Sequence, residues 1–221
     1  MIIDKENKET YLIVLLNIFL ISIALSSPWL NNTISNHDFV KSYFAFFGLA
    51  LLMIFSIYIN LKNEEITFKI NPIKISLLIL FLAGLFSLFW SVNTDLTINK
   101  ILLWTIGLFG FVVAKKLNNS SENLLRLTWG LVLMAGAISI IGVLQYLLDP
   151  FTLTQAASPS STFGNKNIAS QPLVLIFPLS LILIVSNKSH GIKAWILTIS
   201  IALILSYIFY TKTRAVWIAL F

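Results

Sequence analysis

Cysteine is absent from this chain of 221 residues. Its absence excludes disulfide frameworks, thiolate metal sites and cysteine nucleophiles. Charged residues are scarce as well, at 11% of the chain against about 25% in an average soluble domain. Hydrophobic residues instead make up 57% of the chain. A soluble fold of this size cannot bury so much apolar surface, so the composition predicts a protein whose solvent is the lipid bilayer.

The charge that is present is mainly basic. The chain has 15 Lys and Arg against 9 Asp and Glu, for a formal net charge of +6. These positive residues are scattered between apolar runs, a pattern that indicates membrane topology and argues against a nucleic-acid partner. Most of the apolar runs contain no ionisable residue, which argues against an ion-coupled transporter.

The apolar residues fall into long runs. A transmembrane helix needs about 20 mostly apolar residues. Seven runs reach or approach this length, at 11–27, 42–60, 75–92, 101–114, 124–148, 168–186 and 194–211. An eighth run begins at Ala215 and is too short to cross before Phe221. We therefore expect an all-α fold: a polytopic transmembrane helix bundle of seven full spans and a truncated eighth, in a single membrane domain over residues 1–221.

Small residues recur on these runs. We expect them to mark close contacts between helices rather than a substrate path, because small side chains allow two helix backbones to approach. The residues concerned are Ser56, Gly84, Ser87, Gly107, Gly110, Gly130, Gly136, Ser139 and Gly142.

The distribution of Lys and Arg predicts the orientation of the chain. Loops that face the cytoplasm carry the excess of positive residues. Ten of the 15 positive residues fall in the N-terminus and the even-numbered loops. The other five are Lys41, Lys100, Lys166, Lys212 and Arg214. We expect a cytoplasmic N-terminus and odd-numbered loops that face outward, which in a bacterium is the periplasm or the cell exterior.

The loop before the sixth run is unusually polar. Its Gly164-Asn165 pair is a turn signal, and Asn167 is a candidate cap for the next helix. The N-terminus of that helix would offer free N–H groups and a positive dipole end to an anion. Pro172 and Pro178 are expected to kink the same helix. On the local pattern alone, an ordinary turn with a helix cap is the favoured interpretation.

A second polar segment, Tyr210 to Trp217, separates the seventh and eighth runs. Its Arg214 is held close to the membrane boundary, and a guanidinium binds phosphate oxygens in a bidentate manner. The alternative is that Lys212 and Arg214 only anchor helix ends at the lipid headgroups. Both polar segments fall on the outer side by the charge count, which favours a shared site.

Three stretches in this order resemble motifs of a known family. Leu88-Phe89-Trp90-Ser91-Val92-Asn93 resembles a Trp-Ser turn, and Ser161-Thr162-Phe163-Gly164-Asn165-Lys166-Asn167 a Thr-Phe-Gly-Asn-x-Asn motif. Thr211-Lys212-Thr213-Arg214-Ala215 resembles a Ser/Thr-Arg-Gly/Ala motif. The family is that of the O-antigen ligases, which includes polymerase-like and protein O-oligosaccharyltransferase members, and the chain is similar to its N-terminal part.

The resemblance implies glycosyl transfer at the outer face of the inner membrane. The donor would be a glycan on undecaprenyl diphosphate, and the acceptor a hydroxyl of lipid A-core, of another glycan or of a protein. The resemblance implies neither a metal nor another cofactor. The residues that it places at the donor diphosphate are Arg214, Lys212, Lys166, Asn165, Asn167 and Gly164.

The chain departs from the family pattern at the catalytic base. The resemblance implies a His in a large external loop that follows these spans, whereas His37 lies in the first outer loop and His190 on the cytoplasmic side. We therefore expect the chain to be inactive alone, as a fragment, a relic or one half of a split protein whose second chain supplies the rest. A polysaccharide polymerase of the same superfamily, or a non-enzymatic small-solute permease or membrane subunit, are the alternatives.

Overall fold

The computed structural model describes residues 5–27, 29, 37–62, 72–117, 121–151, 153–186 and 191–220. These residues form eight α-helices, one short 3-10 helix and no strand. The helices are α1 (Lys5–Leu25), α2 (His37–Lys62), α3 (Pro72–Phe86), η1 (Ser87–Trp90), α4 (Thr94–Leu117), α5 (Ser121–Leu147), α6 (Lys166–Val185), α7 (Ile192–Thr211) and α8 (Arg214–Leu220). The all-α prediction is confirmed for this part of the chain.

Each helix coincides with one of the apolar runs, but only some of the helices are long and apolar enough to cross a membrane. Among the described residues, α5, α6 and α7 are long and apolar enough to cross a membrane. Shorter apolar stretches occupy Thr10–Leu25, Val40–Ile54 and Ile75–Trp90. The structure therefore supports a membrane-like helical protein with three such helices, and the predicted seven full spans go beyond what it establishes.

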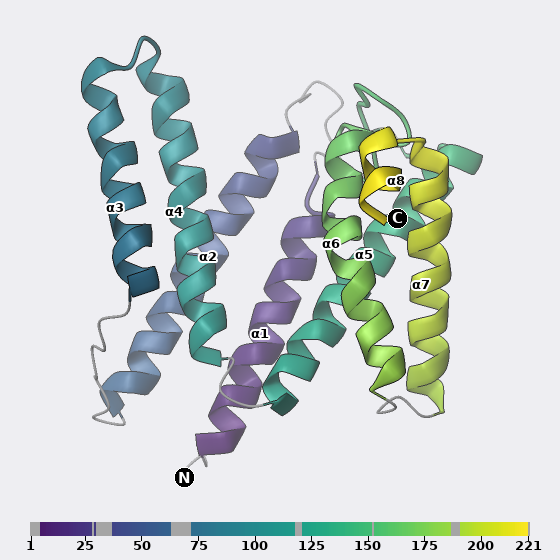
Figure 1. The fold of residues 1–221 in the computed structure, drawn as a ribbon, viewed down its shortest axis with the longest axis horizontal. Coiled ribbons are helices and arrows are strands. Elements are labelled where there is room, and N and C mark those ends of the chain that lie inside the picture. The colour runs from purple at the N-terminus through teal and green to yellow at the C-terminus, as the bar shows by residue number, and fades with distance from the viewer. Residues whose placement is uncertain are drawn as a thin grey trace.

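The helices run up and down, so that their ends gather at two opposite ends of the bundle (Figure 1). α5 packs against α1 on one side and against α6 and α7 on the other, and α8 lies against α6. α2 joins α1 to α4, and α3 packs on α4. The starts of α2, α6 and α8 lie at the end of the bundle opposite the N-terminus.

The main core lies between α5, α6 and α7. Its centre includes Ile138, Leu173 and Ile204, one from each helix, and all three are fully buried. Val216 of α8 joins the same cluster. A second cluster of buried apolar residues forms where α1 meets α2.

The glycines of α5 allow its neighbours to approach closely. A Cβ atom on Gly142 would lie 2.1 Å from the ring of Tyr207 on α7, and one on Gly130 would lie 2.1 Å from the side chain of Asn17 on α1. Gly136 faces Ser200 of α7. The predicted close packing is confirmed at these three positions. The prediction of close packing is wrong for Gly84 of α3 and for Gly107 and Gly110 of α4. A Cβ atom at any of these three positions would have no neighbour within 4 Å.

Candidate functional site

The part of the polar loop that leads from α5 into α6 at Ser160–Thr162 is buried in the bundle. Ser160, Ser161 and Thr162 are 0% exposed. The Gln145 amide of α5 donates a hydrogen bond to the Ser161 carbonyl over 3.0 Å, and the Tyr207 hydroxyl of α7 donates to the carbonyl of Pro159 over 2.9 Å. The loop is therefore docked between α5 and α7 and is more than a surface turn.

Gly164 makes the turn that leads from this loop into α6, as its sequence predicts. Its φ angle is +70°, a left-handed conformation that L side chains rarely adopt. A Cβ atom here would also lie 2.4 Å from the imidazole of His37, the first residue of α2. Both the backbone conformation and the close contact therefore require glycine at this position.

The cap of α6 is Asn165, not Asn167 as predicted. Asn165 has an extended backbone, and its side-chain oxygen accepts a hydrogen bond from the N–H of Asn167 over 2.9 Å. The carbonyl of Asn165 accepts from Ile168 and Ala169, and the N–H of Lys166 donates to the loop carbonyl of Ala157. The N–H groups of the first helical turn are thus all in use. The expectation of free N–H groups for an anion is wrong, and only the positive end of the helix dipole remains available.

The structure brings the two polar segments of the sequence together. The Thr213 hydroxyl donates a hydrogen bond to the side-chain oxygen of Asn167 over 3.1 Å. Lys166 and Arg214 each adjoin one member of this pair in the sequence. Burial of Val216 in the main core holds α8 against α6, and so fixes the segment that carries Arg214.

Three cationic residues adjoin the Thr213–Asn167 pair in the sequence. Lys212 and Arg214 are exposed and Lys166 is half-buried. Lys212 caps the C-terminus of α7 in a left-handed conformation, with φ of 52°. None of the three side chains forms an ion pair or a hydrogen bond with any residue that the structure describes. Their positive charge is available to an anionic ligand, beside the positive end of the α6 dipole.

Two residues outside the predicted site, His37 and Lys41, also face this loop. The apolar runs predict both in the first outer loop, whereas they lie in the first turns of α2 and are buried, at 4% and 8% exposure. The two ring nitrogens of His37 lie 2.9 Å from the Ser27 hydroxyl and 2.7 Å from the Thr154 carbonyl. The imidazole is therefore held by internal partners. The i, i+4 spacing of His37 and Lys41 at the start of an apolar run is a sequence signal that would place both side chains on one face of a helix.

Lys41 joins the end of α1 to the loop. Four acceptors lie within 2.7–3.1 Å of its ammonium nitrogen: the carbonyls of Ile23, Ala24 and Ser26 and the Thr162 hydroxyl. The three N–H groups reach all four because one of them is shared between two acceptors. It also lies 4.2 Å from the centre of the Phe163 ring. Lys41 thus contacts the residues directly before the Gly164 turn.

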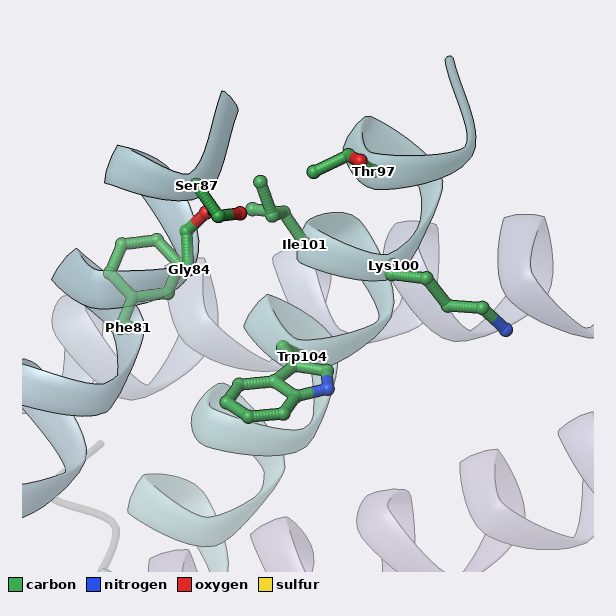
Figure 2. Close-up of a pocket in the computed structure, with 7 residues that line it drawn as sticks. All are labelled: Phe81, Gly84, Ser87, Thr97, Lys100, Ile101 and Trp104. Carbon is green, nitrogen blue, oxygen red and sulfur yellow. The ribbon is translucent and has the colours of Figure 1, made fainter. Parts of the chain in front are cut away.

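A pocket of about 200 Å³ lies elsewhere, between α3, η1 and α4. Its lining is mostly apolar, and Figure 2 shows the Lys100 side chain extending away from Phe81 and Ser87. The Ser87 hydroxyl donates to the carbonyl of Gly84. Because few polar groups converge on it, this pocket is a weaker candidate site than the junction of α6 and α8.

No family model, curated protein or solved structure matches the chain. Among the described residues, no group of three or more His, Asp or Glu side chains is placed to hold a metal ion.

Proposed function

We propose that the chain is a multi-pass protein of the bacterial inner membrane with seven spans, an eighth segment and a cytoplasmic N-terminus. The support comes from three apolar helices of span-like length and from helix ends that alternate between the two ends of the bundle. The uneven distribution of Lys and Arg gives the orientation. In this arrangement the junction of α6 and α8 faces outward.

We infer that this junction binds the diphosphate of a polyprenyl-linked glycan, as the resemblance to O-antigen ligases implies. The observation that carries the inference is the hydrogen bond between Thr213 and Asn167, which joins the two motifs of that resemblance. Arg214, Lys212 and Lys166 are the proposed contacts to the phosphate oxygens. Gly164 and Asn165 shape the turn that presents Lys166 and Asn167.

This arrangement suits a glycosyl transfer reaction. As the bond between the sugar and the diphosphate breaks, negative charge grows on the leaving oxygen, and cations fixed nearby stabilise that charge. Arg214 offers a planar fork of donors, whereas Lys166 and Lys212 act as point charges. The acceptor, a hydroxyl of lipid A-core, of another glycan or of a protein, would lose its proton to a base outside the residues named here. A polysaccharide polymerase would use the same donor site and differ in its acceptor.

Binding of a labelled undecaprenyl diphosphate-linked glycan to membranes that contain the protein tests this proposal. A charge-assisted hydrogen bond contributes about 1.5–3 kcal/mol, so Arg214→Ala is expected to weaken binding by about 10- to 100-fold. Lys193→Ala is the matched control, because Lys193 is an exposed cation near the start of α7, at the opposite end of the bundle. Equal donor affinity of Arg214→Ala and the parent protein would remove the assignment.

A further inference from the structure

We propose that Lys41 is the positioning residue of the candidate site and holds the loop from Ser160 to Asn165 in the conformation that presents Lys166. The identity of the ligand in this inference rests on the proposed function, whereas the holding of the loop does not. Lys41 belongs to α2, far in sequence from the site, and is 8% exposed.

Lys41 supplies hydrogen-bond donors to carbonyl groups at the C-terminal end of α1. The last carbonyls of an α-helix have no partner within the helix. The Lys41 ammonium group donates to Ile23 and Ala24 near the end of α1 and to Ser26 directly after it. An ammonium group also interacts favourably with the negative end of a helix dipole. The side chain therefore belongs structurally to the C-terminus of α1, although it comes from α2.

Thr162 connects this cap to the loop. Its hydroxyl accepts a hydrogen bond from Lys41 and donates one to the carbonyl of Ala24. The next residue, Phe163, lies with its ring against the same ammonium group. Since both residues are fixed by Lys41, the turn at Gly164 begins from a defined point.

The turn then determines where α6 starts. His37, one helical turn before Lys41, covers Gly164 so closely that no Cβ atom would fit. Asn165 caps α6 directly afterwards, and Asn167 contacts Thr213. A loop released from Lys41 would shift the first turn of α6, and with it the distance between Lys166 and Arg214.

Cysteine labelling measures the position of the loop directly, because the chain contains no cysteine of its own. Ser160→Cys places a thiol at a position that is 0% exposed, and Ser200→Cys places one at a 6% exposed position of α7. Each cysteine is introduced into the full chain, alone and together with Lys41→Met, Lys41→Arg or Lys193→Met. The rate of its reaction with a maleimide is then measured on the protein in detergent.

We expect Lys41→Met to speed labelling at Ser160→Cys by about tenfold or more, since a loss of about 1.4 kcal/mol in local closure changes the open population by that factor. Lys41→Arg keeps the charge and the donors and is expected to restore protection. Labelling at Ser200→Cys stays slow in every background. Unchanged labelling at Ser160→Cys, or equal acceleration at both cysteines, would overturn the proposal.

The second measurement is the affinity for undecaprenyl diphosphate in detergent micelles. We expect Lys41→Met to weaken it and Lys193→Met to leave it unchanged. If Lys41→Met speeds labelling but binds undecaprenyl diphosphate as tightly as the parent, while Arg214→Ala binds it more weakly, then Lys41 does not position the site. If Arg214→Ala also binds normally, the proposed function fails, and the labelling rates alone decide whether Lys41 holds the loop.

Discussion

The helices α5 to α8 and the helices α3 and α4 are similarly apolar, yet they pack in different ways. α5, α6 and α7 share a core with several side chains at 0% exposure, including Val132, Leu173 and Ile204. In contrast, no described side chain from α3, η1 or α4 is classed as buried. Phe89, Trp90 and Val92, where α3 and η1 turn toward α4, are among the most exposed apolar residues.

The difference follows from small and polar residues. In a bilayer, lipid tails are as apolar as leucine, so hydrophobic content alone does not draw helices together. The glycines of α5 bring its backbone against its neighbours, whereas those of α3 and α4 have open space around them. The buried loop adds hydrogen bonds from Gln145, Ser161 and Tyr207, which tie it to α5 and α7. Close packing therefore lies where small residues and internal polar contacts coincide.

The largest expected effect separates two glycine substitutions. Gly142→Ala places a methyl group 2.1 Å from the Tyr207 ring and is expected to lower the free energy of unfolding by about 2–3 kcal/mol, as overpacking does. Gly107→Ala adds the same atom in open space and is expected to raise it by up to about 1 kcal/mol through helix propensity. Unfolding of the two variants in detergent gives both values. Effects of the same sign and size would break the distinction between the two regions.

An intermediate effect is expected at the docked loop. Tyr207→Phe removes the donor to the Pro159 carbonyl and is expected to cost about 1–2 kcal/mol of unfolding free energy, because a buried acceptor loses its partner. Tyr146→Phe is the control, since Tyr146 is 45% exposed and its contact with Tyr210 is a ring stack that survives the change. A thermal unfolding series of the two variants checks the prediction, and equal midpoints would show that the loop is not tied to α7.

The smallest effect concerns the junction itself. Thr213→Val removes the hydrogen bond to Asn167. Because this hydrogen bond is exposed to solvent, its loss is expected to lower the affinity for undecaprenyl diphosphate by only about twofold to fivefold. Thr97→Val makes the same change on α4, where Thr97 contacts Ser91, and is expected to leave the affinity unchanged. Titration of both variants decides the point. A similar loss in Thr97→Val would place ligand binding outside the junction of α6 and α8.

Much of the fold follows from the sequence because apolar runs and turn residues are local signals. Each helix lies on a predicted run, and Gly164-Asn165 makes the predicted turn. Which helices pair is not a local signal. The sequence therefore does not show that Gly142 lies against another helix whereas Gly107 has open space around it. Helix ends are set by capping contacts, which the sequence does not show, and the cap of α6 is Asn165, two positions before the predicted Asn167.

The candidate site was predicted in part. The sequence indicated that the segments around Asn167 and Arg214 belong together, and the structure joins them through Thr213. The roles of Arg214, Lys212 and Lys166 toward a diphosphate stay predictions. Lys41 and His37 do not stand out in the sequence, because the unbroken apolar run that predicts the second span begins only at Ser42. Their partners, the carbonyls at the end of α1 and in the loop, are brought close only by the tertiary fold.

Crosslinking in intact membranes tests the central claim that α6 and α8 form one outward-facing site. In the otherwise cysteine-free chain, Asn167→Cys and Thr213→Cys are introduced together and treated with a short thiol crosslinker that does not cross membranes. We expect rapid intramolecular crosslinking from the outer side, and none between Asn167→Cys and a cysteine at Thr97 on α4. Absence of the crosslink between positions 167 and 213, or its formation only after the membrane is permeabilised, would contradict the account.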